Sequence, residues 1–169
     1  PIEFDYYSPH KQQQTHRIAD VHLLHNFIGD WYAVSFDHQE KDFRDFNIGR
    51  MKNLKLTGEY FEIQKSWNAE DYLRKGFYMM RGGKLTKVQI WFDPYQSQWI
   101  KERNYFHPDE KREELADGSI RLSFEVGENG LEAVARFCLT YAGNCIAEKP
   151  DKLKQIIQEK LKKALELNR

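Results

Sequence analysis

The stretch HNFIGDWYAVSFDHQEKDFRDFNIGR, residues 25–50, decides the fold of this 169-residue chain. An aromatic strand over 31–36 is followed by a polar loop and by a second strand from Phe43 that carries Arg44 and Arg50. These two arginines are an even number of positions apart, so on a strand they point to the same face. Guanidinium groups at the rim of a small barrel suit a phosphate or a carboxylate. The alternative that stays open is an ordinary barrel strand with surface arginines.

The first 65 residues predict one small β-barrel. Alternating polar and apolar residues are separated there by polar or glycine-containing turns, which is typical of short strands. The predicted strands cover residues 2–7, 15–24, 30–37, 43–48, 51–57 and 60–64. So many short strands favour closure into a barrel, because closure removes exposed strand edges.

The pattern changes at Ser66, which, like Asn68, can cap a helix that runs to about Met79. We therefore expect a helical linker over residues 66–85. The remainder, residues 86–169, gives strand and helix signals in the order β-α-β-β-α-β, which is the ferredoxin-like signature. The expected strands are 88–92, 103–107, 120–126 and 144–148, with helices at 94–102 and 131–141. The sequence therefore predicts an α+β protein.

A final helix is expected to open at Pro150-Asp151. Its apolar side chains recur at helical spacing and form a stripe that needs a partner surface. The stripe consists of Leu153, Ile156, Ile157, Leu161, Ala164 and Leu165. Its own sheet and a second subunit are both possible partners.

Composition narrows the class of protein. Hydrophobic residues make up 40% of the chain and charged residues 31%, which is typical of a soluble globular protein. No apolar run approaches the ~20 residues that cross a bilayer, so we expect a cytoplasmic protein without membrane contact. The 26 basic residues balance the 26 acidic residues. Sequence-blind duplex binding is therefore disfavoured, and any nucleic-acid contact depends on a few placed arginines.

Catalytic and metal chemistry find little support. His22 and His25 would point to opposite faces of a strand, which does not suit a zinc site. Neither Cys138 nor Cys145 lies beside a histidine, and both are interpreted as small buried hydrophobic residues in a reducing compartment. We expect no catalytic residue, no metal and no cofactor.

Two separate stretches resemble one family, the WYL domain, which is named after a Trp-Tyr-Leu triplet. The triplet is Trp31-Tyr32-Ala33 here, and residues 44–51 (RDFNIGRM) follow the family's arginine-rich strand. Arg17 also occupies a position where the family tends to carry arginine. From Val88 onward the chain resembles the C-terminal extension (WCX) that commonly follows WYL domains. This part of the resemblance lies in the stretches VQIWF (88–92), KER (101–103) and DGS (117–119), and in Pro150.

The resemblance implies an Sm-like, SH3-type barrel over 1–65, joined by the linker to a ferredoxin-like extension. It further implies the ligand-sensing half of a bacterial transcription regulator, which works as a homodimer and reaches promoter DNA only through an N-terminal helix-turn-helix domain outside this sequence. The implied ligand is a nucleotide or a short single-stranded nucleic acid. The implied ligand-binding residues are Arg17, His25, Tyr32, Arg44, Asn47, Arg50 and Arg103.

Asn47 departs from the family pattern, because many members carry an arginine there. The change removes one possible phosphate contact. A rival interpretation is an assembly module without a small ligand, in which the barrel and the final helix mediate oligomerisation.

Overall fold

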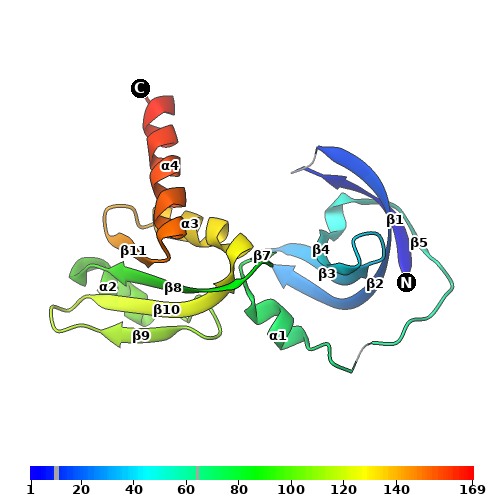
Figure 1. Cartoon of the computed structure of the whole chain (residues 1–169), viewed down its shortest axis with the longest axis horizontal. Helices are drawn as coiled ribbons and strands as arrows, with labels where there is room; N and C mark the ends of the chain where they lie inside the picture. The colour runs from blue at the N-terminus through cyan, green and yellow to red at the C-terminus, as the bar shows by residue number, and fades with distance from the viewer. Residues whose placement is uncertain (10–11, 64) are drawn as a thin grey trace. The chain divides into compact units, whose positions relative to one another are not determined.

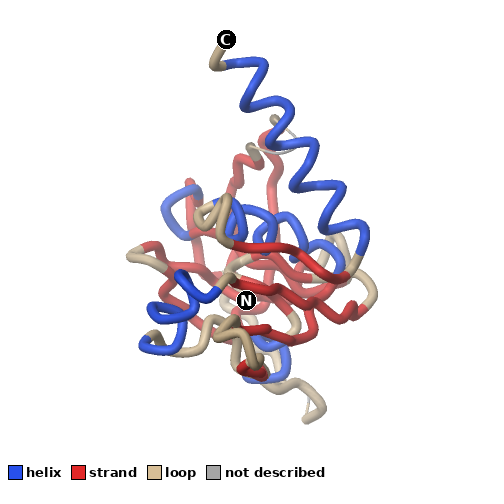
Figure 2. Tube along the Cα trace, turned by 90° about the vertical axis from the view of Figure 1, so that its left-hand side faces the viewer, coloured by secondary structure: helices blue, strands red, loops and turns tan. Residues whose placement is uncertain are grey.

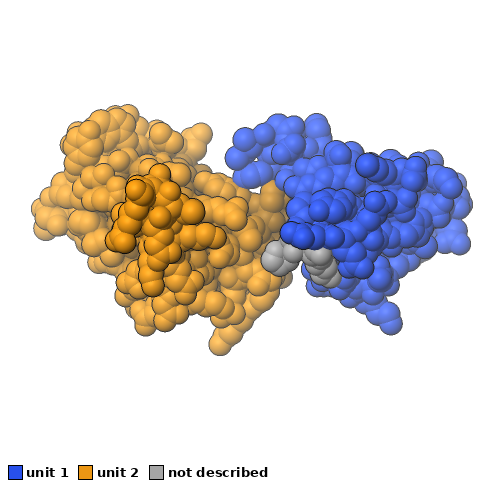
Figure 3. Space-filling view, turned by 90° about the horizontal axis from the view of Figure 1, so that it is seen from above, with its two compact units in different colours: residues 1–69 blue, residues 70–169 orange. Residues whose placement is uncertain are grey.

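The computed structural model describes residues 1–9, 12–63 and 65–169. The chain is α+β and divides into two compact units, Pro1–Ala69 and Glu70–Arg169, which are coloured separately in Figure 3. Each unit has its own hydrophobic core. The units are therefore described one at a time.

Unit 1 is a five-stranded antiparallel sheet with the strand order β4-β3-β2-β1-β5 (Figure 1). The strands are β1 (Ile2–Ser8), β2 (Gln13–Phe27), β3 (Asp30–Asp37), β4 (Asp42–Asn47) and β5 (Met51–Leu56). Between β2 and β3 the chain turns through Ile28 and Gly29, both with positive φ, a conformation that glycine adopts without strain. The alternation of polar and apolar residues in the sequence thus produces strands at nearly the predicted places.

The core of unit 1 is aromatic. Phe4, Tyr6 and Phe46 meet pairwise edge to face, with ring centroids 5.0 to 6.0 Å apart. Such pairs add about 0.5–1.5 kcal/mol beyond simple burial. Ala19 lies among the three rings and is fully buried. Small and large side chains thus fill one face of the sheet together.

The structure corrects the strand that was expected to carry both Arg44 and Arg50. Strand β4 ends at Asn47, and Ile48–Arg50 forms the short 3-10 helix η1. The chain must leave β4 at one edge of the sheet and enter β5 at the other, and η1 makes this change of direction. Because η1 breaks the alternation, the predicted common face of Arg44 and Arg50 is wrong.

Two further predictions, for residues 60–64 and for residues 66–85, are wrong. Residues 60–63 form no strand, and Gln64 lies outside the described residues. The expected linker helix is only α1 (Ala69–Arg74), and the chain then forms a small hairpin of β6 (Gly76–Phe77) and β7 (Met80–Arg81). The helix ends at Arg74, and Gly76 begins the hairpin at a position where a Cβ would lie 2.9 Å from the Cβ of Arg81, its partner strand residue.

Unit 2 has its elements in the predicted order β-α-β-β-α-β. They are β8 (Leu85–Phe92), α2 (Pro94–Glu102), β9 (Lys111–Glu114), β10 (Ile120–Gly127), η2 (Glu128–Gly130), α3 (Leu131–Leu139) and β11 (Cys145–Lys149), followed by α4 (Asp151–Leu167). The sheet order is β11-β8-β10-β9, and every neighbouring pair is antiparallel. The second strand occupies Lys111–Glu114 and not the predicted 103–107.

The core of unit 2 lies between this sheet and its helices. Val88, Ile90 and Phe92 of β8 are fully buried, as is Leu122 of β10. They pack in one cluster with the buried side of α3. The alternate positions of the same strands carry polar side chains on the opposite face of the sheet.

The apolar side chains of helix α4 pack against the core of unit 2 in its first half. Leu153 is fully buried, and Ile156 and Ile157 pack against the core. Beyond them, Leu161 is 42% exposed and Leu165 is 67% exposed. Figures 1 and 2 show this second half of the helix extending away from the rest of unit 2. The predicted stripe is therefore covered by its own unit over part of its length.

Candidate functional site

Three of the predicted ligand residues form a row across unit 1. Tyr32 on β3 lies directly opposite His25 on β2 and Asn47 on β4. Facing residues of adjacent antiparallel strands share one face of the sheet, so these side chains are neighbours. His25 and Tyr32 are half-buried, whereas Asn47 is buried and its backbone N–H donates to the hydroxyl of Tyr6 over 3.1 Å.

Arg50 comes three positions after Asn47 in the chain. It is the last residue of η1, whose N-cap is Asn47, and η1 lies against β3. The side chain of Arg50 is exposed. Within residues 1–9, 12–63 and 65–169, its guanidinium has neither a hydrogen-bond nor an ion-pair partner. Arg50 thus leaves a charged planar donor group open to solvent at the end of η1.

Arg17 and Arg44 are in a different electrostatic situation, because acidic side chains hold both. Nη1 of Arg17 lies 2.7 Å from Oδ2 of Asp37 and 3.5 Å from Oε1 of Glu40. The other carboxylate oxygen of Glu40 lies 3.5 Å from Nη2 of Arg44. Arg17 is only 8% exposed, whereas the Arg44 side chain is 50% exposed. An incoming anion must therefore compete with Glu40, and Arg44 is the more accessible of the two.

Arg103 belongs to unit 2. It is the C-cap residue of α2, its side chain is exposed, and its guanidinium has no partner in the part of the chain that the structure describes. Arg103 lines a shallow hollow of about 220 Å³ with Tyr95, Gln96 and Trp99 of α2. It also lines a second hollow of about 470 Å³, formed with the segment that follows the helix. Arg103 was predicted from the sequence, but Tyr95 and Trp99 were not. Their spacing by four positions on a helix was the available signal.

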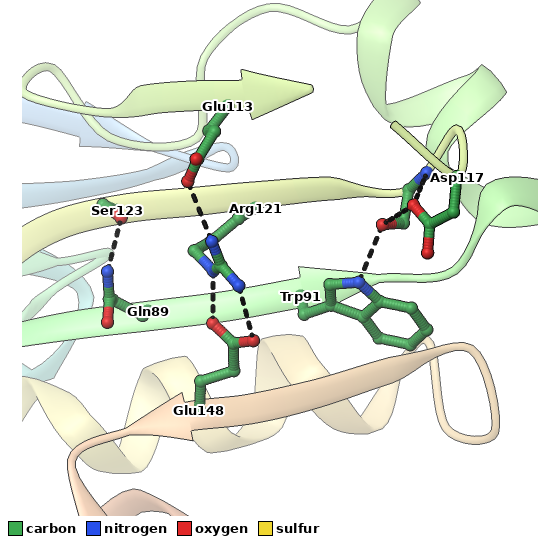
Figure 4. Close-up of polar contacts among 8 residues, drawn as sticks. Gln89, Trp91, Glu113, Asp117, Arg121, Ser123 and Glu148 are labelled. Atoms are coloured by element: carbon green, nitrogen blue, oxygen red, sulfur yellow. Dashed lines mark hydrogen bonds and ion pairs between the residues drawn. The ribbon is translucent and has the colours of Figure 1, made fainter. Parts of the chain in front are cut away.

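The helix-free face of the unit 2 sheet carries a polar network that is internally satisfied (Figure 4). Arg121 forms an ion pair with Glu148 at 2.5 Å and another with Glu113 at 2.9 Å, and these hydrogen-bonded carboxylates raise the pKa of its guanidinium. Gln89 donates to Ser123 over 3.3 Å. Because two carboxylates hold Arg121, its guanidinium is not open to an anion.

A second part of the same face centres on Trp91. Its indole N–H donates to the Ser119 hydroxyl over 2.9 Å, and that hydroxyl donates to Asp117 over 2.5 Å (Figure 4). Hydrogen bonds from the Ser119 side chain and backbone lower the pKa of the Asp117 carboxyl. These hydrogen bonds fix the position of the indole ring, so we interpret the arrangement as structural.

An aromatic cluster on unit 1 was not predicted from the sequence either. The ring of His22 lies 4.9 Å from Phe43, 5.0 Å from Phe61 and 4.9 Å from Trp67, between ring centroids. His22 is therefore a packed ring and does not face solvent as a ligand would. In the described parts of the chain, no group of three or more His, Cys, Asp or Glu side chains is arranged to hold a metal ion. No helix among the described residues is both long and apolar enough to cross a membrane.

Two solved structures are similar to this chain. The chain is similar to a solved structure described as a CRISPR Cas-related protein, with 12% identity and a TM-score of 0.62, over 99% of this chain and 48% of that one. It is also similar to the proteasome accessory factor B/C (PafBC) of Arthrobacter aurescens, with 19% identity and a TM-score of 0.41, over 93% of this chain and 24% of that one. The chain thus spans less than half the length of either protein. Comparison with curated proteins gave no match.

Family models identify both units. A WYL domain model matches residues 1–56, and a WCX domain model matches residues 84–165. The first match contains the row of His25, Tyr32 and Asn47, and the second contains α2 with Arg103. The chain therefore belongs to the WYL family and consists of a WYL domain followed by its WCX extension.

Proposed function

We propose that this chain is the ligand-sensing, non-catalytic part of a transcriptional regulator and that it binds a nucleotide or a short single-stranded nucleic acid. The proposal is carried by two observations in the same unit: the open guanidinium of Arg50 at the end of η1, and the row of His25, Tyr32 and Asn47 that precedes η1 on the sheet. A guanidinium fork matches a phosphate, and a half-exposed tyrosine ring can stack on a base. Both groups lie on the WYL domain, which families of regulators share.

The ion pairs of Glu40 suggest how binding would be transmitted. Glu40 bridges Arg17 and Arg44 from the turn between β3 and β4. A phosphate that replaces Glu40 on Arg44 would remove one contact of that turn, while Asp37 would keep Arg17 in place. Ligand binding would then favour one of two turn conformations, and differential affinity for the two is what a sensor requires.

The finer architecture belongs to the same proposal. The strand order of unit 1 fits an Sm-like barrel in which β4 and β5 approach each other, and the order β11-β8-β10-β9 fits a ferredoxin-like unit. In the proposed cytoplasmic regulator, a separate domain outside this sequence contacts promoter DNA. The regulator would act as a homodimer, because coupling of sensing to DNA binding is commonly achieved through a two-fold arrangement.

The experiment is a titration of a fluorescent single strand of about ten nucleotides with the chain, followed by anisotropy at two salt concentrations. Wild type is expected to bind saturably, and Arg50→Ala is expected to weaken binding by about tenfold because a charge-assisted contact is lost. Arg136→Ala, at an exposed arginine of α3 in unit 2, is the matched control and should change nothing. Equal binding by the Arg50 and Arg136 variants would contradict the proposal.

An assembly role is the second candidate, and the exposed half of α4 favours it. Leu161, Leu165 and Leu167 are 42%, 67% and 76% exposed on one helix. Burying such side chains against a second copy would stabilise a dimer by about 1.5–3 kcal/mol for each residue. Removing residues 161–169 separates the roles, because it deletes the exposed leucines and keeps Leu153, Ile156 and Ile157 in the core. A truncated monomer that still binds the strand would show that ligand binding does not require assembly.

A further inference from the structure

We infer that α2 and the segment after it form a second binding site, in unit 2, that takes unpaired nucleobases of a single-stranded nucleic acid by stacking them on Tyr95 and Trp99 while Arg103 contacts a phosphate. This inference rests on the proposed function and extends it to a surface outside the WYL domain. Tyr95, Trp99 and Arg103 are spaced by four positions, so they lie along one side of the helix.

The aromatic side chains of α2 are displayed and not used for packing. Ser97 and Ile100, which are 1% and 0% exposed, form the side of α2 that faces the core. Tyr95 and Trp99 are 62% and 43% exposed, and their ring centroids lie 4.7 Å apart. A pair of contiguous open rings is the usual platform for stacked bases, because every base has a π-face.

The adjoining charge and shape fit one nucleotide better than a protein helix. The hollow of about 220 Å³ is lined by both rings, by the amide of Gln96 and by the guanidinium of Arg103. An amide can bond to the polar edge of a base, and an arginine without an internal partner can bond to a phosphate or stack on a base. A groove for a protein helix would instead be long and mostly apolar.

The site is also held rigid. At the N-terminus of α2, Asp93 accepts from the backbone N–H of Gln96 over 2.7 Å. At its C-terminus, the guanidinium of Arg112 donates to the carbonyls of Ile100, Arg103 and Asn104 over 2.8, 3.1 and 3.2 Å. The carbonyl of Ile100 also accepts from the backbone N–H of Arg103 over 3.3 Å, so Arg112 ties the last turn of α2 to the segment that follows it.

A buried carboxylate completes this scaffold. Glu110, whose side chain is 0% exposed, binds Arg112 at 2.5 Å and accepts from the backbone N–H of Phe106 over 2.9 Å. The guanidinium of Arg112 also lies 4.7 Å from the ring centre of Tyr105. Because Glu110 and Arg112 fix the backbone around Arg103, a ligand would meet a site that is already ordered, which lowers the entropic cost of binding.

The test uses the full 169-residue chain and a labelled oligothymidine of about ten nucleotides, beside an abasic strand of equal length. Trp99→Ala is expected to weaken binding of the oligothymidine by about 5- to 150-fold, the range for loss of one stacked base. Trp99→Phe should retain most of the affinity because it keeps a ring. Arg103→Gln should reduce the slope of log K against log salt concentration by about 0.7, the value for one phosphate contact on a single strand.

The controls make the outcome decisive. Tyr60→Ala removes a fully exposed ring on unit 1 and should leave binding unchanged. The abasic strand should be insensitive to Trp99→Ala, because it offers no base to stack. An equal loss of binding to both strands would overturn the stacking site.

The same titration separates the two proposals. Loss of binding in the Arg50→Ala variant, with full binding by the Trp99→Ala and Arg103→Gln variants, would overturn the second site and keep the sensing role of the WYL domain. No binding by the wild-type chain would overturn both.

Discussion

Replacing Arg112 by methionine removes the guanidinium that holds the end of α2, and it tests how unit 2 is stabilised. The side chain of Arg112 is 15% exposed and contacts Glu110, which is fully buried. Methionine keeps most of the length and apolar contact of the arginine side chain. The variant therefore isolates the loss of charge and of three hydrogen bonds to backbone carbonyls.

The magnitude follows from what the substitution leaves behind. Without Arg112, the carboxylate of Glu110 stays buried with the backbone N–H of Phe106 as its remaining donor. Breaking a buried pair by removing one partner costs about 3–5 kcal/mol, because the other charge is left uncompensated. Glu110→Gln should cost less, about 1–3 kcal/mol, because Arg112 keeps its carbonyl partners and some contact with water. The double variant should cost less than the sum of the two single variants.

Urea unfolding followed by tryptophan fluorescence measures these changes. The chain has two units, so a background with Trp31→Phe and Trp67→Phe restricts the signal to the tryptophans of unit 2. With a slope of about 2 kcal/mol per molar urea, a loss of ~3–5 kcal/mol lowers the midpoint by about 1.5–2.5 M. Arg136→Met, at an exposed position of α3, is the control. A midpoint for Arg112→Met within about 0.3 M of that control would refute the reasoning.

Three shorter predictions concern other parts of the molecule. Ser119→Ala should raise the pKa of the Asp117 carboxyl towards the ordinary aspartate value in an NMR titration, and an unchanged titration would contradict the assignment. Because the pKa of Asp117 is lowered in the folded chain, its carboxylate stabilises unit 2 above the ordinary aspartate pKa, and this stabilisation is lost as the pH falls through the folded-state pKa. The thiol of Cys145 should react with iodoacetamide before that of Cys138, because the hydrogen bond between the two side chains lowers the pKa of Cys145 and, together with burial, raises the pKa of Cys138. Peptide mass spectrometry measures the two labelling rates, and equal rates would contradict the prediction. Leu165→Glu should convert a dimer into a monomer in light scattering while leaving the urea midpoint of unit 2 within about 0.3 M, and a persistent dimer would place the interface elsewhere.

Much of the fold could be predicted because a strand with one buried face has alternating apolar and polar residues in its sequence. Residues 120–127 alternate between buried and partly exposed positions over most of β10, and the predicted strand lies inside the observed one. Pro94 marked the start of α2, because proline suits the first turn of a helix. These signals are local, so a single sequence contains them.

The change of direction at η1 could not be predicted in the same way. Ile48 and Arg50 continue the parity of Arg44 and Phe46, so the sequence contains no break in the pattern. The need for a turn arises from the sheet order, which places β5 beside β1. Tertiary topology overrides local periodicity here, and it moved Arg50 off the strand that was expected to carry it.

Which arginines form ion pairs with carboxylates could not be predicted from the sequence either. Arg17 meets Asp37, which is 20 positions away, and only the pairing of β2 with β3 brings the two together. Arg44 has the same residue type and a similar place in the family pattern, yet it is half exposed and shares Glu40. Residue type predicts that an arginine can bind an anion, but the fold decides whether a carboxylate already occupies it.

The division between occupied and open arginines determines what kind of anion this chain can select. Arg17, Arg112 and Arg121 each have a carboxylate within 2.7 Å, so exchanging it for a phosphate would cost an established ion pair. Arg50 and Arg103 require no such exchange. In the proposed complexes with a single strand, each of these arginines would contribute a salt slope of only about −0.7, far below the slope of a protein held on DNA by six to ten contacts. With so little affinity from charge, discrimination must come from the rings and amides beside the two arginines. The neutral overall charge of the chain thus favours recognition of bases over recognition of a polyanion.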